Sequence, residues 1–97
     1  MMMINDFKKE VLVWAEQIGV EPKEIHVRRM TKKWASCSSR GRLTFSFELL
    51  NKSYPQRAKA IVHELLHLKY NSHNKMFKSL LSAHLAKRGI ISKSIKL

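Results

Sequence analysis

The segment His63-Glu64-Leu65-Leu66-His67 combines residue types and a spacing that can activate water on a metal ion. On a helix, side chains four positions apart lie on one face, so the imidazoles of His63 and His67 can bind one ion. Glu64 lies off that line, where its carboxylate can reach a water on the open side of the metal. Zinc with an open coordination position lowers the pKa of bound water to about 7, and a neighbouring carboxylate can accept its proton. The segment therefore predicts a catalytic zinc site with Glu64 as the general base.

The bland alternative is a histidine pair on the surface of a helix, or buried in a core with ordinary hydrogen-bond partners. The residues around the motif argue against it, because Ile61, Val62, Leu65 and Leu66 are all apolar. A helix with that sequence is buried on most sides, and imidazoles and a carboxylate are costly there without a metal or other partners. We therefore favour the metal site.

A third ligand is expected at His73, six positions beyond His67, where a chain leaving the helix can turn back. Capping or solvent exposure is the alternative role for this histidine. His84 is the rival ligand, but it lies near an apolar helical stripe and is interpreted as a packing residue. Glu48 belongs to an expected strand far from the motif, and His26 is interpreted as a strand-surface residue.

The composition indicates one small domain covering residues 1–97, with 44% hydrophobic residues. The beginning of the sequence lacks the apolar core of a signal peptide, and no segment is long and apolar enough to cross a bilayer. Cys37 is the single cysteine, so an internal disulfide is excluded. These features predict a cytoplasmic protein that does not enter a membrane. They leave its oligomeric state open.

Positive charge is the other unusual feature, with a formal net charge of +12. Arg28, Arg29, Lys32 and Lys33 form the strongest cluster and are candidates for binding an acidic substrate, a phosphate or nucleic acid. A solvated surface is the alternative interpretation. Tyr70 is a further candidate, because its hydroxyl could support a developing oxyanion beside the site, although packing is an equal alternative.

Periodicity predicts a helix followed by three strands and then two helices, which is the order of an α+β domain. The sheet is expected to be mainly antiparallel, because its strands are short and successive. The motif helix is expected to begin with a capping box at Ser53 and Gln56. The predicted helices are 5–18, 53–70 and 74–87, the strands are 25–30, 33–38 and 43–49, and 90–97 is expected to add a strand or an extended arm.

The sequence RMTKKWASCSS at 29–39, followed by GRLT at 41–44, HELLHL at 63–68, His73 and Phe77, resembles the YgjP-type metal-dependent hydrolases. These bacterial and archaeal proteins are related to the WLM and SprT-like metallopeptidases. The resemblance implies a zincin-like fold, one zinc bound by His63, His67 and His73, and Glu64 as general base. It also implies that the segment WASCS at 34–38 forms strands beside the metal. Ala35 departs from the usual glycine, a change that a strand tolerates. A metzincin is rejected, because Tyr70 occupies the position of an essential glycine and no Met-turn follows.

Three functions are consistent with these residues. The first is a zinc-dependent metallopeptidase acting on a peptide or protein. The second is a hydrolase of nucleotide phosphoanhydride bonds, in which the cluster at 28–33 would neutralise phosphates; phosphate chemistry more often uses carboxylate-bound Mg²⁺, so it ranks second. The third is a basic, DNA-associated binding module with little turnover, whose zinc would be structural.

Overall fold

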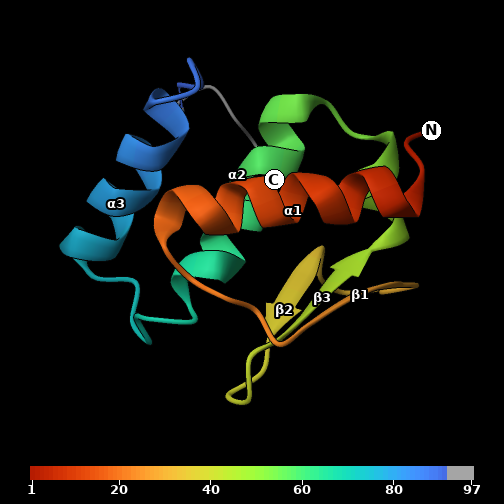
Figure 1. The fold of residues 1–97 in the computed structure, drawn as a ribbon, viewed down its shortest axis with the longest axis horizontal. Helices are drawn as coiled ribbons and strands as arrows, with labels where there is room; N and C mark the ends of the chain where they lie inside the picture. The colour runs from red at the N-terminus through yellow and green to blue at the C-terminus, as the bar shows by residue number, and fades with distance from the viewer. Residues whose placement is uncertain (92–97) are drawn as a thin grey trace.

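The computed structural model describes residues 1–91, in which helices cover one face of a three-stranded sheet (Figure 1). Helix α1 crosses in front of α2, the sheet lies below both, and α3 lies beside α2. This arrangement confirms the α+β fold. The elements in chain order are α1 (Ile4–Ile18), β1 (Glu24–Arg28), β2 (Ala35–Cys37), β3 (Arg42–Ser46), η1 (Phe47–Asn51), α2 (Tyr54–Leu66) and α3 (Lys75–Ala86).

The sheet has the strand order β1-β3-β2, and its central strand pairs in two directions. β3 pairs antiparallel with β2 through the turn at residues 38–41, whereas β1 and β3 run parallel. The sheet is therefore mixed rather than mainly antiparallel. The reason is that the chain leaving β1 crosses to the far side of β3 before it forms the hairpin. As a result, β2 lies at an edge of the sheet, next to α2.

The core lies between the sheet and the first two helices. Leu43 and Phe45 of β3 are fully buried, and the ring of Phe7 in α1 packs edge-on against Phe45 at 5.2 Å. Ile61 and Leu65 bury the inner side of α2. Alternation along β3 therefore directs apolar side chains to the helices, which hold α2 against the sheet.

The third strand is shorter than expected and ends at Ser46 instead of continuing to residue 49. The Ser46 hydroxyl accepts a hydrogen bond from the Glu48 backbone N–H at 3.2 Å and begins the short 3-10 helix η1. Phe47 is consequently 43% exposed and does not share the buried face of Leu43 and Phe45. The local side-chain cap overrides the strand alternation here.

Helix α2 begins as predicted, with a capping box in which Ser53 and Gln56 bond to each other's backbone N–H groups. It ends at Leu66, four residues earlier than predicted, and His67 is its C-cap residue. Turns tighten the chain beyond this point, and the Tyr70 N–H bonds to the Leu66 carbonyl at 2.8 Å. His63 thus lies in the last turn of α2, and His67 immediately follows it.

Helix α3 is capped by the Asn74 side chain, which accepts a hydrogen bond from the Phe77 N–H at 2.9 Å. Gly89 ends this region with a positive φ of 75°, and the Ile90 N–H then bonds back to the Leu85 carbonyl. The predicted strand or arm at 90–97 falls mainly in residues 92–97, outside the described residues. Among residues 1–91, none of the helices combines the length and apolar character needed to cross a bilayer.

Candidate metal centre

Three histidines converge at the end of α2. His63 and His67 come from successive turns of the chain, and His73 returns from the loop that leads to α3. The Nε2 atom of His73 lies 2.9 Å from Nε2 of His63 and 2.8 Å from Nε2 of His67. In a tetrahedral zinc site the ligand nitrogens are about 3.3 Å apart, for Zn–N bonds of about 2.0–2.1 Å. The three ligand nitrogens lie within 4.8 Å of one another, so small shifts of the rings would bring them to this spacing around one ion.

The hydrogen bonds made by the Nδ1 atoms determine whether the Nε2 atoms, which face the cluster, carry a hydrogen or a lone pair. Nδ1 of His63 lies 2.9 Å from the Glu64 carboxylate, and Nδ1 of His67 lies 3.1 Å from the Tyr70 carbonyl oxygen. Both oxygens can only accept, so each neutral ring carries its hydrogen on Nδ1 and leaves Nε2 bare. A single hydrogen on His73 cannot satisfy two such lone pairs, whereas a metal cation can bind all three nitrogens. The donor set therefore fits a metal ion.

The site is half-open to solvent. His63 and His67 are half-buried, while His73 is exposed. Loss of solvent around the cluster lowers the pKa of His73 below its ordinary value, and the neighbouring His63 and His67 lower that pKa further. The negative charge of Glu64 raises the pKa of His73 and so opposes these two effects. The net effect keeps His73 in the neutral form that binds metal.

The side chain of Phe77 contacts all three histidines, a role that its place in the sequence did not reveal. Its ring is buried, with centroids 5.5 Å from His63, 4.8 Å from His67 and 4.9 Å from His73. The position is set by the Asn74 cap, which begins α3 just after His73. Sequence spacing alone could place Phe77 on a helix but not under the metal site.

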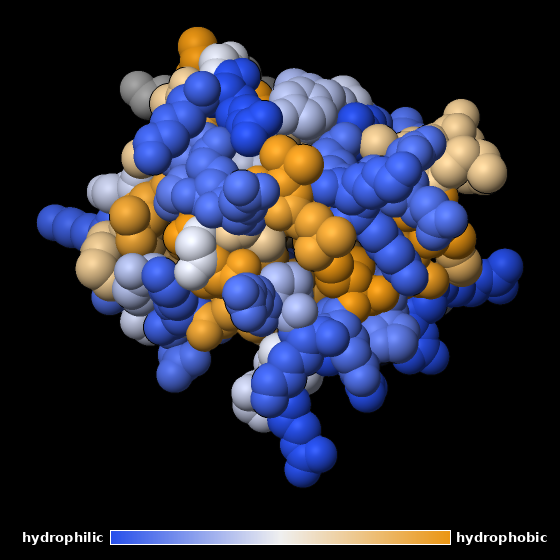
Figure 2. All heavy atoms as spheres, in the orientation of Figure 1, coloured by the Kyte–Doolittle hydropathy of each residue, from blue (hydrophilic) through white to orange (hydrophobic). Residues whose placement is uncertain are grey.

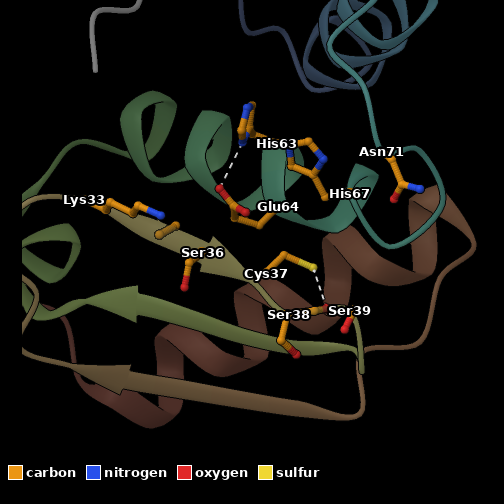
Figure 3. Close-up of a pocket in the computed structure, with 10 residues that line it drawn as sticks. Lys33, Ser36, Cys37, Ser38, Ser39, His63, Glu64, His67 and Asn71 are labelled. Atoms are coloured by element: carbon orange, nitrogen blue, oxygen red, sulfur yellow. Dashed lines mark hydrogen bonds and ion pairs between the residues drawn. The ribbon is translucent and has the colours of Figure 1, made fainter.

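A cleft of about 540 Å³ runs beside the histidines, between α2 and the edge strand β2 (Figure 3). Glu64 is buried in its wall and, among residues 1–91, contributes the only carboxylate of the lining. Burial raises the pKa of the Cys37 thiol on the opposite wall, and the negative charge of Glu64 raises that pKa further. The serines and Asn71 had not been singled out as site residues. The cleft is lined by Lys33, Ala35, Ser36, Cys37, Ser38, Ser39, His63, Glu64, His67 and Asn71.

The substrate-binding candidates have different positions. Lys33 lines the cleft, while Arg28, Arg29 and Lys32 line a neighbouring cavity. Tyr70 is not among the cleft residues; its side chain packs against the core and its carbonyl orients His67. The structure thus brings the backbone carbonyl of Tyr70 to the site.

The rival ligands lie elsewhere. His84 is bonded to Gln17, whose side-chain amide reaches both the imidazole and the carbonyl of His84, so this histidine joins α3 to α1. His26 is exposed on β1 and pairs with Glu24 at 3.0 Å. Glu48 lies in η1. None of them belongs to the cluster of His63, His67 and His73.

A histidine-rich metal centre on an H-E-x-x-H helix, beside the edge of a small sheet, is the arrangement of a zincin-like metallopeptidase domain. Residues 2–96 match the family described as "YgjP-like, metallopeptidase domain". The chain therefore belongs to the YgjP-like metallopeptidase family, which confirms the resemblance noted in its sequence.

One solved structure with a similar fold is the crystal structure of the metallopeptidase zymogen of Pyrococcus abyssi abylysin. The match has a TM-score of 0.67 and 21% sequence identity, and it covers 82% of this chain and 77% of that chain. At this identity the likeness supports the fold. A search of curated proteins gave no match.

Proposed function

We propose that the chain is a zinc-dependent metallopeptidase in which His63, His67 and His73 hold the metal and Glu64 is the general base. The observation that carries the proposal is the convergence of three Nε2 atoms, two of them bare lone pairs, at the wall of a cleft. Imidazole ligands suit zinc, whereas Mg²⁺ prefers carboxylate oxygens. The single carboxylate of the cleft therefore favours peptide hydrolysis over magnesium-dependent phosphate chemistry.

When bound, zinc supplies a Lewis acid and lowers the pKa of a coordinated water. Glu64 provides the proton transfer that peptide hydrolysis needs. Its Oε2 is held by His63, and within residues 1–91 its Oε1 has no hydrogen-bond partner. Oε1 can thus accept the proton of the attacking water and later donate it to the leaving amine nitrogen.

The edge strand β2 offers a place for the peptide backbone. It pairs with β3 on one side, and its other side faces the cleft below α2. An extended peptide can add to such an edge through backbone hydrogen bonds. This position would bring a peptide carbonyl past the three histidines and Glu64, which supports a peptide or protein as the substrate.

Glu64→Gln tests this proposal, because glutamine keeps the size of the side chain but cannot accept the proton. Wild type and variant would be loaded with zinc, analysed for metal content and incubated with a mixed peptide library, with cleavage products read by mass spectrometry. We expect equal zinc content and loss of turnover by at least about 100-fold. Equal cleavage by both proteins would exclude Glu64 as the base, and a wild type that takes up no zinc would reject the metallopeptidase proposal.

A further inference from the structure

Four cations beside the cleft have no role in the chemistry proposed so far. Arg28 ends β1, and Arg29, Lys32 and Lys33 follow in the loop to β2; we call these four residues the basic loop. All four are exposed, and they line a cavity of about 420 Å³ with Ser36 and Thr44. No carboxylate from the described part of the chain lines this cavity.

Among residues 1–91, no partner neutralises the charge of the basic loop. Within residues 1–91, none of its four side chains makes an ion pair or a side-chain hydrogen bond. Other cations do find partners: Arg42 lies 2.6 Å from Glu24, and Arg57 lies 2.9 Å from Glu10. Several unpaired cations around one cavity create a positive electrostatic potential, which attracts an anionic ligand.

The cavity of the basic loop adjoins the metal cleft. Lys33 and Ser36 line both hollows. Figure 3 shows Lys33 at one end of the cleft, with its amino group pointing inward along β2. Lys33 therefore lies between the cleft beside the histidines and the other cations of the basic loop.

We propose that the basic loop binds an acidic segment of the peptide substrate, so that peptides with several carboxylates on one side of the cleaved bond are preferred. This inference rests on the proposed peptidase function. A peptide paired with Ala35–Cys37 that extends beyond Ala35 advances about 3.3 Å per residue and soon reaches Lys33 and Lys32. Continuity with the edge strand favours a peptide over nucleic acid, because a duplex would contact the loop from outside and would not use the cleft.

The surface of the remaining molecule offers a weaker candidate. Figure 2 shows apolar side chains among hydrophilic ones on the face that α1 crosses, and Leu12 and Val13 of α1 are 53% and 47% exposed. Nothing in the structure indicates what would cover that face, whereas the basic loop is defined by charge and by its connection to the cleft.

Binding can be measured apart from turnover with zinc-loaded Glu64→Gln protein and fluorescent peptides. Two peptides carry a block of Glu and Asp, one of them before and the other after an uncharged segment. Two matched peptides carry Gln and Asn in place of Glu and Asp. We expect the better acidic peptide to bind about tenfold more tightly than its neutral counterpart, since several exposed ion pairs each add a small factor. The difference should shrink at high salt.

Two double variants locate the effect. Lys32→Glu with Lys33→Glu should abolish the preference, whereas Lys9→Glu with Lys87→Glu should keep it, although both pairs change the net charge equally. The inference would be overturned if wild-type loop residues bound acidic and neutral peptides equally. It would also be overturned if both double variants lost the preference for acidic peptides to the same extent. A short DNA duplex that binds through Lys32 and Lys33 more tightly than the acidic peptide would assign the loop to nucleic acid and also overturn it.

Cleavage of the same peptides by zinc-loaded wild type separates this inference from the proposed function. Equal kcat/KM for acidic and neutral peptides would leave the peptidase intact and reject the acidic preference. Selective binding through Lys32 and Lys33 with no cleavage of any peptide would reject the peptidase and retain the preference of the loop.

Discussion

The ring of Phe77 lies 4.8 Å from the ring of His67, although the two residues belong to different helical segments. Through this contact, and those with His63 and His73, the first turn of α3 becomes the floor of the metal centre. The packing of α3 against α2 is therefore part of the site and not only of the core.

Phe77→Ala should weaken both folding and metal binding. Removing a buried phenylalanine costs about 3–5 kcal/mol of unfolding free energy. It also frees the imidazoles, and loss of such support lowers metal affinity by about 10–100-fold. Leu85→Ala is the control. Leu85 is also fully buried on α3, so its removal should destabilise the fold, but it lies at the other end of the helix from Phe77. Competition with a chromophoric chelator on the folded proteins would measure affinity; equal affinities in the two variants would exclude this role for Phe77.

His73→Ala should reduce zinc affinity by more than about 100-fold, since removing a ligand exceeds the effect of removing a residue that only orients one. Elemental analysis after dialysis against a weak chelator would follow the loss. His84→Ala should retain its zinc, because His84 is bonded to Gln17 instead of facing the cluster. Retention of zinc by the His73 variant would show that the ion binds elsewhere.

The lowered pKa of His73 predicts the behaviour of the metal-free protein in acid. Its ordinary value is 6.5, and loss of solvent together with His63 and His67 moves the folded-state value below it. The unfolded chain therefore binds more protons near and below that pH, so this group makes folding less favourable as the pH falls. NMR titration of the imidazole in the metal-free protein would measure the pKa, and a value above 6.5 would contradict the prediction.

Cys37 reports on the charge of the cleft. Burial raises the pKa of its thiol above 9.0, and Glu64 adds to the rise, so the thiol is protonated at neutral pH and should react slowly with disulfide reagents. Glu64→Gln removes the negative charge and should accelerate the reaction a few-fold. The rate in denaturant gives the unshifted reference. A variant that reacts more slowly than wild type would show that Glu64 does not act on this thiol.

Some of these features follow from the sequence alone because they depend on neighbours along the chain. The spacing of His63 and His67, the Ser53–Gln56 capping box and the order of helices and strands are local, and the structure contains each of them. The ends of elements were less predictable. A serine cap redirected the chain after Ser46, and His67 became the C-cap of α2 rather than an interior residue.

Only the tertiary structure decided what meets around the histidines. The parallel pairing of β1 with β3 leaves β2 at the edge beside α2, and no local pattern could specify that crossing. The approach of His73 was expected from its place just beyond the motif helix. The floor formed by Phe77 and the position of the basic loop beside the cleft, in contrast, join segments whose packing no local pattern specifies. They depend on how the helices and strands pack, because burial of the shared core sets those distances.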